Sequence, residues 1–219
     1  MPPTEPILLS PAEARVLGAL VEKEVTTPYY YPLSLNALVN ACNQKSNRDP
    51  AVSFDETTVE QALSTLQQKG LALRTQAGGS RVAKFLHSLL DRLDLSRQEI
   101  ALLCELLVRG PQTVGELRGR CERMQPFTTL EEVELALRTM AEHDPPLVRR
   151  LARGAGRKEP RFAHLLSGEP DVAADAAAYP ISPGTTPDER VRRLEEQVDR
   201  ISNELGELRR AFEEFRRQF

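Results

Sequence analysis

The chain of 219 residues has few cysteines and no long apolar runs. Cys42, Cys104 and Cys121 are widely spaced, form no CxxC pair and have no histidine nearby, so we expect buried thiols in helices rather than a zinc site or a disulfide. No apolar stretch approaches the roughly 18 residues that span a bilayer, so we expect no membrane segment. The first six residues contain neither a cationic nor an apolar region, so we expect no secretory signal and a cytoplasmic location.

The sequence also lacks catalytic motifs. It contains no nucleophile elbow, phosphate-binding loop, metal-ligand spacing or paired-carboxylate motif. We therefore expect a protein that is not an enzyme and that needs no cofactor or metal.

A strong charge of either sign is lacking as well, since the net charge is −3. Residues 1–91 hold 8 Lys/Arg against 9 Asp/Glu, residues 92–166 hold 13 against 11, and residues 167–219 hold 8 against 12. No segment is strongly basic, so any contact with nucleic acid has to come from a local patch.

One pattern occurs twice in the chain. The first copy contains, in order, Leu9–Glu13, Cys42, Val59–Leu63 and Lys84–His87, and the second contains Leu95–Glu99, Cys121, Val133–Leu137 and Arg161–His164. Each copy predicts three helices followed by a hairpin, which is the order of a winged helix-turn-helix unit. The fold class we expect is mostly α with small β-hairpins, in two tandem winged helix-turn-helix domains at 9–91 and 92–166, preceded by a disordered 1–8.

Capping boxes mark the expected helix starts. They are Ser10/Glu13, Ser53/Glu56, Ser96/Glu99, Thr113/Glu116, Thr128/Glu131 and Thr186/Glu189. Apolar periodicity predicts helices at 11–25, 35–42, 56–69, 97–109, 114–123 and 129–143. It predicts strands at 71–75, 81–87, 147–152 and 161–165.

The last part of the chain has a different character. Residues 167–186 lack periodicity and predict a flexible linker. Residues 187–219 predict a coiled-coil helix. Its seam is Val191, Leu194, Val198, Ile201, Leu205, Leu208, Phe212, Phe215 and Phe219. We favour homo-oligomerisation through a parallel coiled coil, dimer or trimer, over packing of this stripe against the chain's own domains.

Several short motifs resemble the YceH-like proteins, a bacterial family built from two winged-helix domains. They are Tyr31–Leu38, Asn43–Pro50, Gly79–Val82, Arg109–Thr113 and Gly156–Glu159, of which Asn43–Pro50 is the most specific. The resemblance covers roughly residues 9–168, and the C-terminal heptads are similar to tails in the family. Tyr29-Tyr30 departs from the more acidic, less aromatic pair expected there. The resemblance implies the fold but no assigned activity, so DNA binding of the transcription-regulator type follows from fold analogy alone.

The second wing carries the most local positive charge in the chain. Its cations are Arg149, Arg150, Arg153, Arg157, Lys158 and Arg161. Guanidinium groups suit phosphates, so we favour contact with DNA or another anion. The alternative is a solvated hairpin with ion pairs to Glu142 or Asp144.

The connection between the second and third helices of the first copy is about a dozen residues, longer than the usual three or four. It contains Asn43, Gln44, Lys45, Asn47 and Arg48. Two interpretations stay open: a loop that contacts DNA, or polar side chains that satisfy the backbone of an extended turn.

Third helices of winged domains read base edges with polar side chains. In the first copy this helix presents Gln61, Ser64, Thr65 and Gln68, which suits such reading. In the second copy it presents mainly glutamates, which repel phosphates. The second copy is therefore expected to read the groove poorly.

The remaining candidates favour structural roles. Tyr29, Tyr30 and Tyr31 are expected to fix a helix entry on the core, with base stacking or partner binding as the alternative. His87 and His164 occupy equivalent positions and are expected to share a structural role at the strand end.

Two functions follow from these observations. The first is a DNA-binding, regulator-like protein, favoured by the basic wing and the polar third helix. The second is a protein-protein adaptor that uses tandem winged helices as a scaffold without DNA, favoured by the net negative charge and the acidic third helix. We prefer DNA binding.

Overall fold

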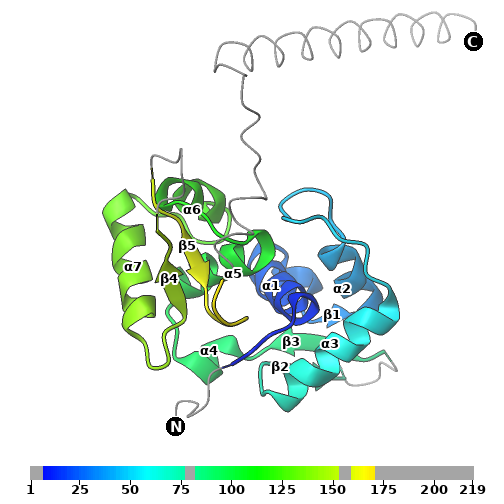
Figure 1. Cartoon of the computed structure of the whole chain (residues 1–219). Helices are drawn as coiled ribbons and strands as arrows, with labels where there is room; N and C mark the ends of the chain where they lie inside the picture. Colours follow the sequence, from blue (N-terminus) through cyan, green and yellow to red (C-terminus); the bar gives the residue numbers. More distant parts are fainter. Residues whose placement is uncertain (1–6, 77–81, 153–158, 171–219) are drawn as a thin grey trace, which may run out of the picture. The chain divides into compact units, whose positions relative to one another are not determined.

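The computed structural model describes residues 7–76, 82–152 and 159–170, which lie in a compact unit of residues 1–176. The second unit, residues 177–219, lies outside the described residues, and so does most of the linker predicted at 167–186. The described part is mostly helical with small antiparallel sheets (Figure 1). Within it, no helix is both long and apolar enough to cross a membrane.

The first copy of the pattern forms three helices and a three-stranded sheet. Its elements are α1 (Pro11–Thr26), η1 (Pro28–Tyr30), β1 (Leu33–Ser34), α2 (Leu35–Cys42), α3 (Glu56–Gln68), β2 (Ala72–Thr75) and β3 (Lys84–His87). The strand order is β1-β3-β2, with both neighbours antiparallel to β3. The alternating burial of β3 places Phe85 in the core.

The second copy repeats this order. Its elements are α5 (Arg97–Arg109), α6 (Val114–Cys121), α7 (Leu130–Glu142), β4 (Val148–Arg150) and β5 (Phe162–His164). β4 and β5 pair antiparallel, and Gln112 adds a single bridge to Phe162 on the other side of β5. This bridge occupies the place that the pairing of Leu33 with Phe85 has in the first sheet.

The helix caps largely follow the expected boxes. Those that begin at Ser10, Ser96 and Thr113 are confirmed, with both reciprocal hydrogen bonds present. Two predicted boxes are wrong by one or two residues. The α3 helix is capped by Asp55 rather than Ser53, and α7 by Thr129 rather than Thr128. A carboxylate or hydroxyl next to the first helical residue caps better than one farther away.

Three short elements were not predicted. They are η1, β1 and α4 (Leu89–Leu93), which connects β3 to α5 and ends at Asp94 with a left-handed φ of 50°. Each has fewer residues than periodicity needs for detection. The strands are also shorter than predicted. Residues 71, 82–83, 147, 151–152, 161 and 165 were expected in strands but lie outside them, and residue 81 is outside the described residues.

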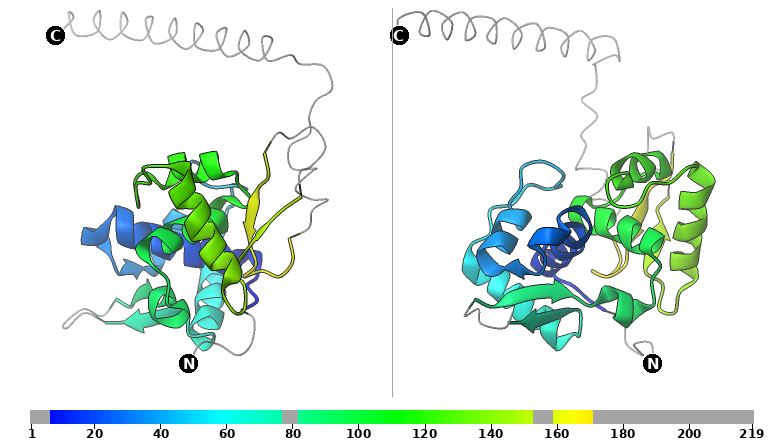
Figure 2. Two further views of the ribbon diagram at one scale, coloured as in Figure 1. Left: turned by 90° about the vertical axis from the view of Figure 1, so that its left-hand side faces the viewer. Right: turned by 180° about the vertical axis from the view of Figure 1, so that it is seen from behind.

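Helices α1 and α5 pack against each other at the centre, with α2 and α3 on one side and α7 with β4 and β5 on the other (Figures 1 and 2). Gly18 is the point of closest approach. A Cβ atom there would lie 2.6 Å from Val108 Cγ1 and 3.1 Å from Leu107 Cβ. The Cys104 thiol donates a hydrogen bond of 3.3 Å to the Gly18 carbonyl. Only a residue without a side chain fits this crossing.

Replacing Gly18 by alanine should lower the free energy of unfolding by about 1–3 kcal/mol, because the added methyl overpacks the crossing. Gly119→Ala is the matched control: its Cβ would have nothing within 4 Å, so helix propensity should leave stability unchanged or raise it. Urea denaturation of both variants measures the difference. Equal midpoints for Gly18→Ala and the parent would contradict the role of this contact.

Candidate nucleic-acid interface

The outer face of α3 carries polar side chains that have no hydrogen-bond partner in the described part of the chain. Gln61, Ser64 and Gln68 are exposed, and their side chains make no hydrogen bond to other described residues. Thr65 is half-buried and its hydroxyl donates back to the Gln61 carbonyl at 3.1 Å. Three of the four predicted residues therefore share one face with free donors and acceptors.

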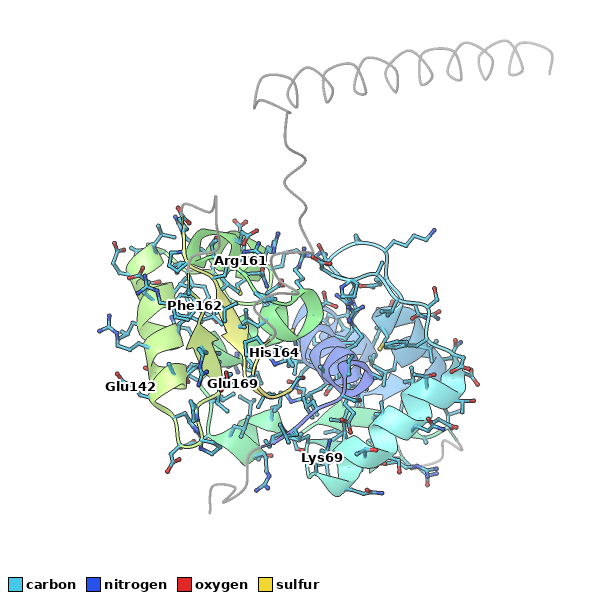
Figure 3. All side chains as sticks on the ribbon, in the orientation of Figure 1. Lys69, Glu142, Arg161, Phe162, His164 and Glu169 are labelled. Atoms are coloured by element: carbon cyan, nitrogen blue, oxygen red, sulfur yellow. The ribbon has the colours of Figure 1, made fainter. Side chains whose placement is uncertain are left out.

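An open groove runs along one side of this face. One wall consists of the segment before α1 and its first turn, and the other of α3 and its C-cap. The lining residues are Leu8, Leu9, Ser10, Ala12, Glu13, Thr58, Gln61, Ala62, Thr65 and Lys69. Lys69 closes one end, because its ammonium lies 2.8 Å from Glu13 Oε2 and 2.6 Å from the Leu8 carbonyl (Figure 3). Lys69 is thus held by the protein, whereas Gln61 stays accessible.

The long loop between α2 and α3 is held mainly by its own polar side chains. The Asn43 amide exchanges two hydrogen bonds of 2.8 Å with the Phe54 backbone. Gln44 accepts from Lys23 at 3.4 Å, and Asn47 accepts from Arg109 at 2.5 Å. These contacts favour the interpretation in which the side chains satisfy an extended turn. Lys45 is the exception, being exposed and without a contact to other described residues.

Arg48 is buried under this loop. Its guanidinium forms two parallel hydrogen bonds to the Glu22 carboxylate, of 3.1 and 2.6 Å, and donates to the Ala41 carbonyl. Its side chain is 0% exposed. The prediction that Arg48 contacts DNA is wrong, because its guanidinium N–H groups all donate to acceptors inside the fold.

Glu22 is the buried acid of this pair. Burial raises its pKa, but the hydrogen bonds and charge of Arg48, together with Lys23, outweigh burial and hold the pKa below its ordinary value of 4.5. Glu22 is therefore charged in the folded protein at neutral pH, and the pair ties the loop to α1.

The predicted cations of the basic wing differ in their surroundings, since some pair with carboxylates and one does not within the described part of the chain. Arg149 pairs with Glu169, and Arg161 lies 3.1 Å from Glu116 (Figure 3). These partners differ from the Glu142 and Asp144 of the alternative interpretation. Arg150 is exposed and has no partner among the described residues. The other predicted wing cations lie outside the described residues, and they are Arg153, Arg157 and Lys158.

The outer face of α7 differs from that of α3. Glu131 and Glu134 are exposed there together with Leu130 and Leu135, whose exposed fractions are 42% and 62%. Arg138 is the only cation exposed on the helix. Figure 1 and the right-hand view of Figure 2 place α3 and α7 on opposite sides of the α1–α5 pair.

The three neighbouring tyrosines separate into two environments. Tyr31 packs against the core and its hydroxyl accepts a hydrogen bond of 2.7 Å from the His87 backbone, in agreement with the expected structural role. Tyr29 and Tyr30 are 98% and 78% exposed. The expectation that all three fix the helix entry is therefore wrong for this exposed pair.

The two equivalent histidines also differ. His87 is buried and its Nε2 lies 2.7 Å from Glu24 Oε2. Burial lowers the pKa of His164 to about 4, and its Nδ1 has no hydrogen-bond partner in the described part. Glu24 has no signal in the sequence, because nothing in the order of residues connects position 24 with position 87.

The three thiols are buried in helices, as the sequence predicted. Burial raises the pKa of Cys42 to about 12, so it stays protonated at neutral pH. Across residues 7–76, 82–152 and 159–170, no group of three His, Cys, Asp or Glu residues could hold a metal ion.

Comparison with known proteins identifies the family. Residues 9–157 match the family described as "Protein of unknown function, DUF480". The chain belongs to this family. It is 54% identical to a UPF0502 protein of Pelobacter propionicus over 97% of this chain and 99% of that protein. It is 52% identical to a UPF0502 protein of Geobacter sulfurreducens, again over 97% and 99%. These matches are consistent with the YceH-like resemblance.

Removing the buried cation should destabilise the fold. Arg48→Met leaves the Glu22 carboxylate buried without its main partner, so the free energy of unfolding at pH 7 should fall by about 3–5 kcal/mol. Arg123→Met is the matched control, since Arg123 is exposed and unpaired among the described residues.

The same pair predicts a pH dependence. The folded pKa of Glu22 is below 4.5, so its contribution is complete above that pH and is lost as pH falls through the folded pKa. The difference between parent and Arg48→Met should therefore shrink in acid. Denaturant titrations between neutral and acidic pH measure it, and a difference that stays constant would contradict the assignment.

Proposed function

We propose that each repeat is a winged helix-turn-helix unit and that the protein binds double-stranded DNA in the manner of a transcription regulator. The order α1-α2-α3-β2-β3, with β1 against β3, supports this for the first repeat. The order α5-α6-α7-β4-β5 supports it for the second. In this fold the third helix enters the major groove and the hairpin contacts the backbone.

The observation that carries the proposal is the free polar face of α3. Gln61 and Gln68 can each donate and accept, as reading of an adenine edge requires, and neither is used within the described chain. Glu60 is exposed one turn before Ser64, at the edge of this face, and its carboxylate repels phosphate. The helix therefore has to approach DNA with Gln61 and Gln68 nearest the bases.

The second repeat contributes the backbone contact. Arg150 is exposed, and its guanidinium has no partner among the described residues, as a phosphate contact needs. Arg149 and Arg161 reach DNA only by leaving their carboxylate partners. The wing therefore supplies fewer contacts than its composition suggests.

A protein-binding role is the second candidate, and the face of α7 favours it. Exposed leucines beside glutamates suit an apolar and basic surface of another protein better than they suit phosphate. The opposite placement of α3 and α7 allows both contacts at once.

Two variants, each with a matched control, test which residues contact the DNA backbone and which contact the bases, in electrophoretic shifts with random and selected duplexes. Arg150→Ala should weaken binding to all sequences and reduce the slope of log affinity against log salt by roughly 0.9, whereas Arg150→Lys should keep the slope. Gln61→Ala with Gln68→Ala should cost about 1–3 kcal/mol of preference per contacted base, and Gln98→Ala on α5 should cost none. Absence of any DNA binding at low salt would favour the adaptor.

Residues 187–219 are proposed to join chains through the predicted seam. The full chain should then sediment as a dimer or trimer, and a truncation after residue 168 should sediment as a monomer, because it lacks the seam. Leu194→Asp with Leu208→Asp should have the effect of the truncation. A full chain that is monomeric at tens of micromolar would contradict this part of the proposal.

A further inference from the structure

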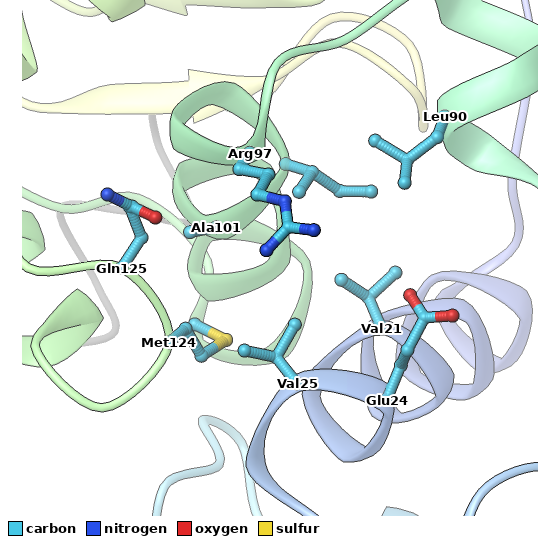
Figure 4. A pocket seen from close by; sticks show the side chains of 9 residues that line it. Val21, Glu24, Val25, Leu90, Arg97, Ala101, Met124 and Gln125 are labelled. Carbon is cyan, nitrogen blue, oxygen red and sulfur yellow. The ribbon is translucent and has the colours of Figure 1, made fainter. Parts of the chain in front are cut away.

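A pocket of about 250 Å³ lies where α1, α4 and α5 meet the turn after α6 (Figure 4). Most of its lining is apolar, and these residues are Val21, Val25, Leu90, Ile100, Ala101 and Met124. Its polar lining consists of Glu24, Arg97 and Gln125. A cavity of about 150 Å³ holds benzene, so this space is large enough for a small metabolite.

Arg97 supplies the positive charge of this pocket. It is the first residue of α5, it is exposed, and its guanidinium has no hydrogen bond or ion pair to other described residues. Figure 4 shows it reaching from α5 toward α1 across the pocket. Five N–H donors are therefore available to an oxyanion.

Glu24 is the anion on the opposite wall, and its position is fixed from behind. The Leu89 N–H lies 3.3 Å from His87 Nδ1 and donates to it, so in the neutral ring the proton is on Nε2. That Nε2–H donates to Glu24 Oε2 at 2.7 Å. In this tautomer the ring orients the carboxylate and leaves its negative charge in place. Its second oxygen, Oε1, accepts nothing from the described residues.

Arg97 and Glu24 line the same pocket, and no ion pair joins them in the described part of the chain. A ligand with only a carboxylate would be opposed by Glu24, and one with only an ammonium would be opposed by Arg97. A zwitterion satisfies both charges. The apolar walls then require an apolar body on the same molecule.

We propose that this pocket binds a free apolar α-amino acid of the size of leucine or methionine. The ligand's carboxylate binds Arg97, its ammonium binds Glu24, and its side chain lies against Val21, Val25 and Met124. The proposal does not rest on DNA binding, since it concerns a different face and a different ligand.

L-leucine is the probe, and methyl resonances of the parent protein are the readout. We expect saturable shifts of the Val21, Val25, Ile100 and Met124 methyls. Two analogues test the two charged groups of leucine separately: 4-methylpentanoate lacks the ammonium and 3-methylbutylamine lacks the carboxylate. Each should bind about tenfold more weakly or worse, because one charge-assisted contact is lost and a like charge is left opposite.

Arg97→Gln and Glu24→Gln should each weaken leucine binding by about tenfold or more. Arg123→Gln is the matched control, an exposed arginine outside the pocket, and should bind as the parent does. Arg97 has no hydrogen bond or ion pair to other described residues, so its variant stays informative even if Glu24→Gln disturbs His87.

Three results would overturn the proposal. The first is the absence of saturable shifts with leucine at millimolar concentrations. The second is equal binding of leucine and 4-methylpentanoate, which would show that Glu24 recognises nothing. The third is unchanged leucine affinity in Arg97→Gln.

Discussion

The close crossing of α1 and α5 is the contact on which the rest of the fold depends. Gly18 lets the two helices approach until the Val108 side chain would collide with any Cβ. Close packing of this kind contributes many dispersion contacts. Arg15 strengthens the junction, because its buried guanidinium donates to the Cys42, Pro50 and Val108 carbonyls and so joins the long loop to both helices. The two repeats share one core rather than standing as separate bodies.

The same repeated framework presents different chemistry in its two copies. The first copy has a polar α3 with free glutamines, and the second has an acidic α7 with exposed leucines. His87 and His164 show the same divergence. In the first copy His87 forms a hydrogen bond with Glu24. Counted from the N-caps of α1 and α5, Gly110 occupies the corresponding place, so His164 finds no carboxylate there. The same order of elements therefore carries different surface chemistry in its two occurrences.

Buried charges explain why much of the apparent positive surface is not available. Arg48 is held by Glu22, Arg161 by Glu116 and Lys69 by Glu13. Removing such a cation from water is tolerated only because a carboxylate and carbonyls replace the lost hydration. Composition counts these groups as basic, but they act within the fold. The groups left for ligands are fewer, and Arg97, Arg150 and Lys45 are among them.

The sequence by itself determined the local structure. Apolar periodicity located α1, α2 and α5 to within a residue at each end, and the boxes at Ser10, Ser96 and Thr113 formed as expected, because caps and amphipathic faces depend on neighbours along the chain. The family also followed from short motifs.

Only the tertiary structure decided which of the polar residues stay free. Arg48 and Arg150 look alike in the sequence, but one is enclosed by Glu22 and the other is exposed. The pocket of Glu24 and Arg97 had no signal in the sequence, because its walls come from separate helices. The physical reason is that pairing and burial of side chains depend on distances in space, and residues far apart in the chain set those distances.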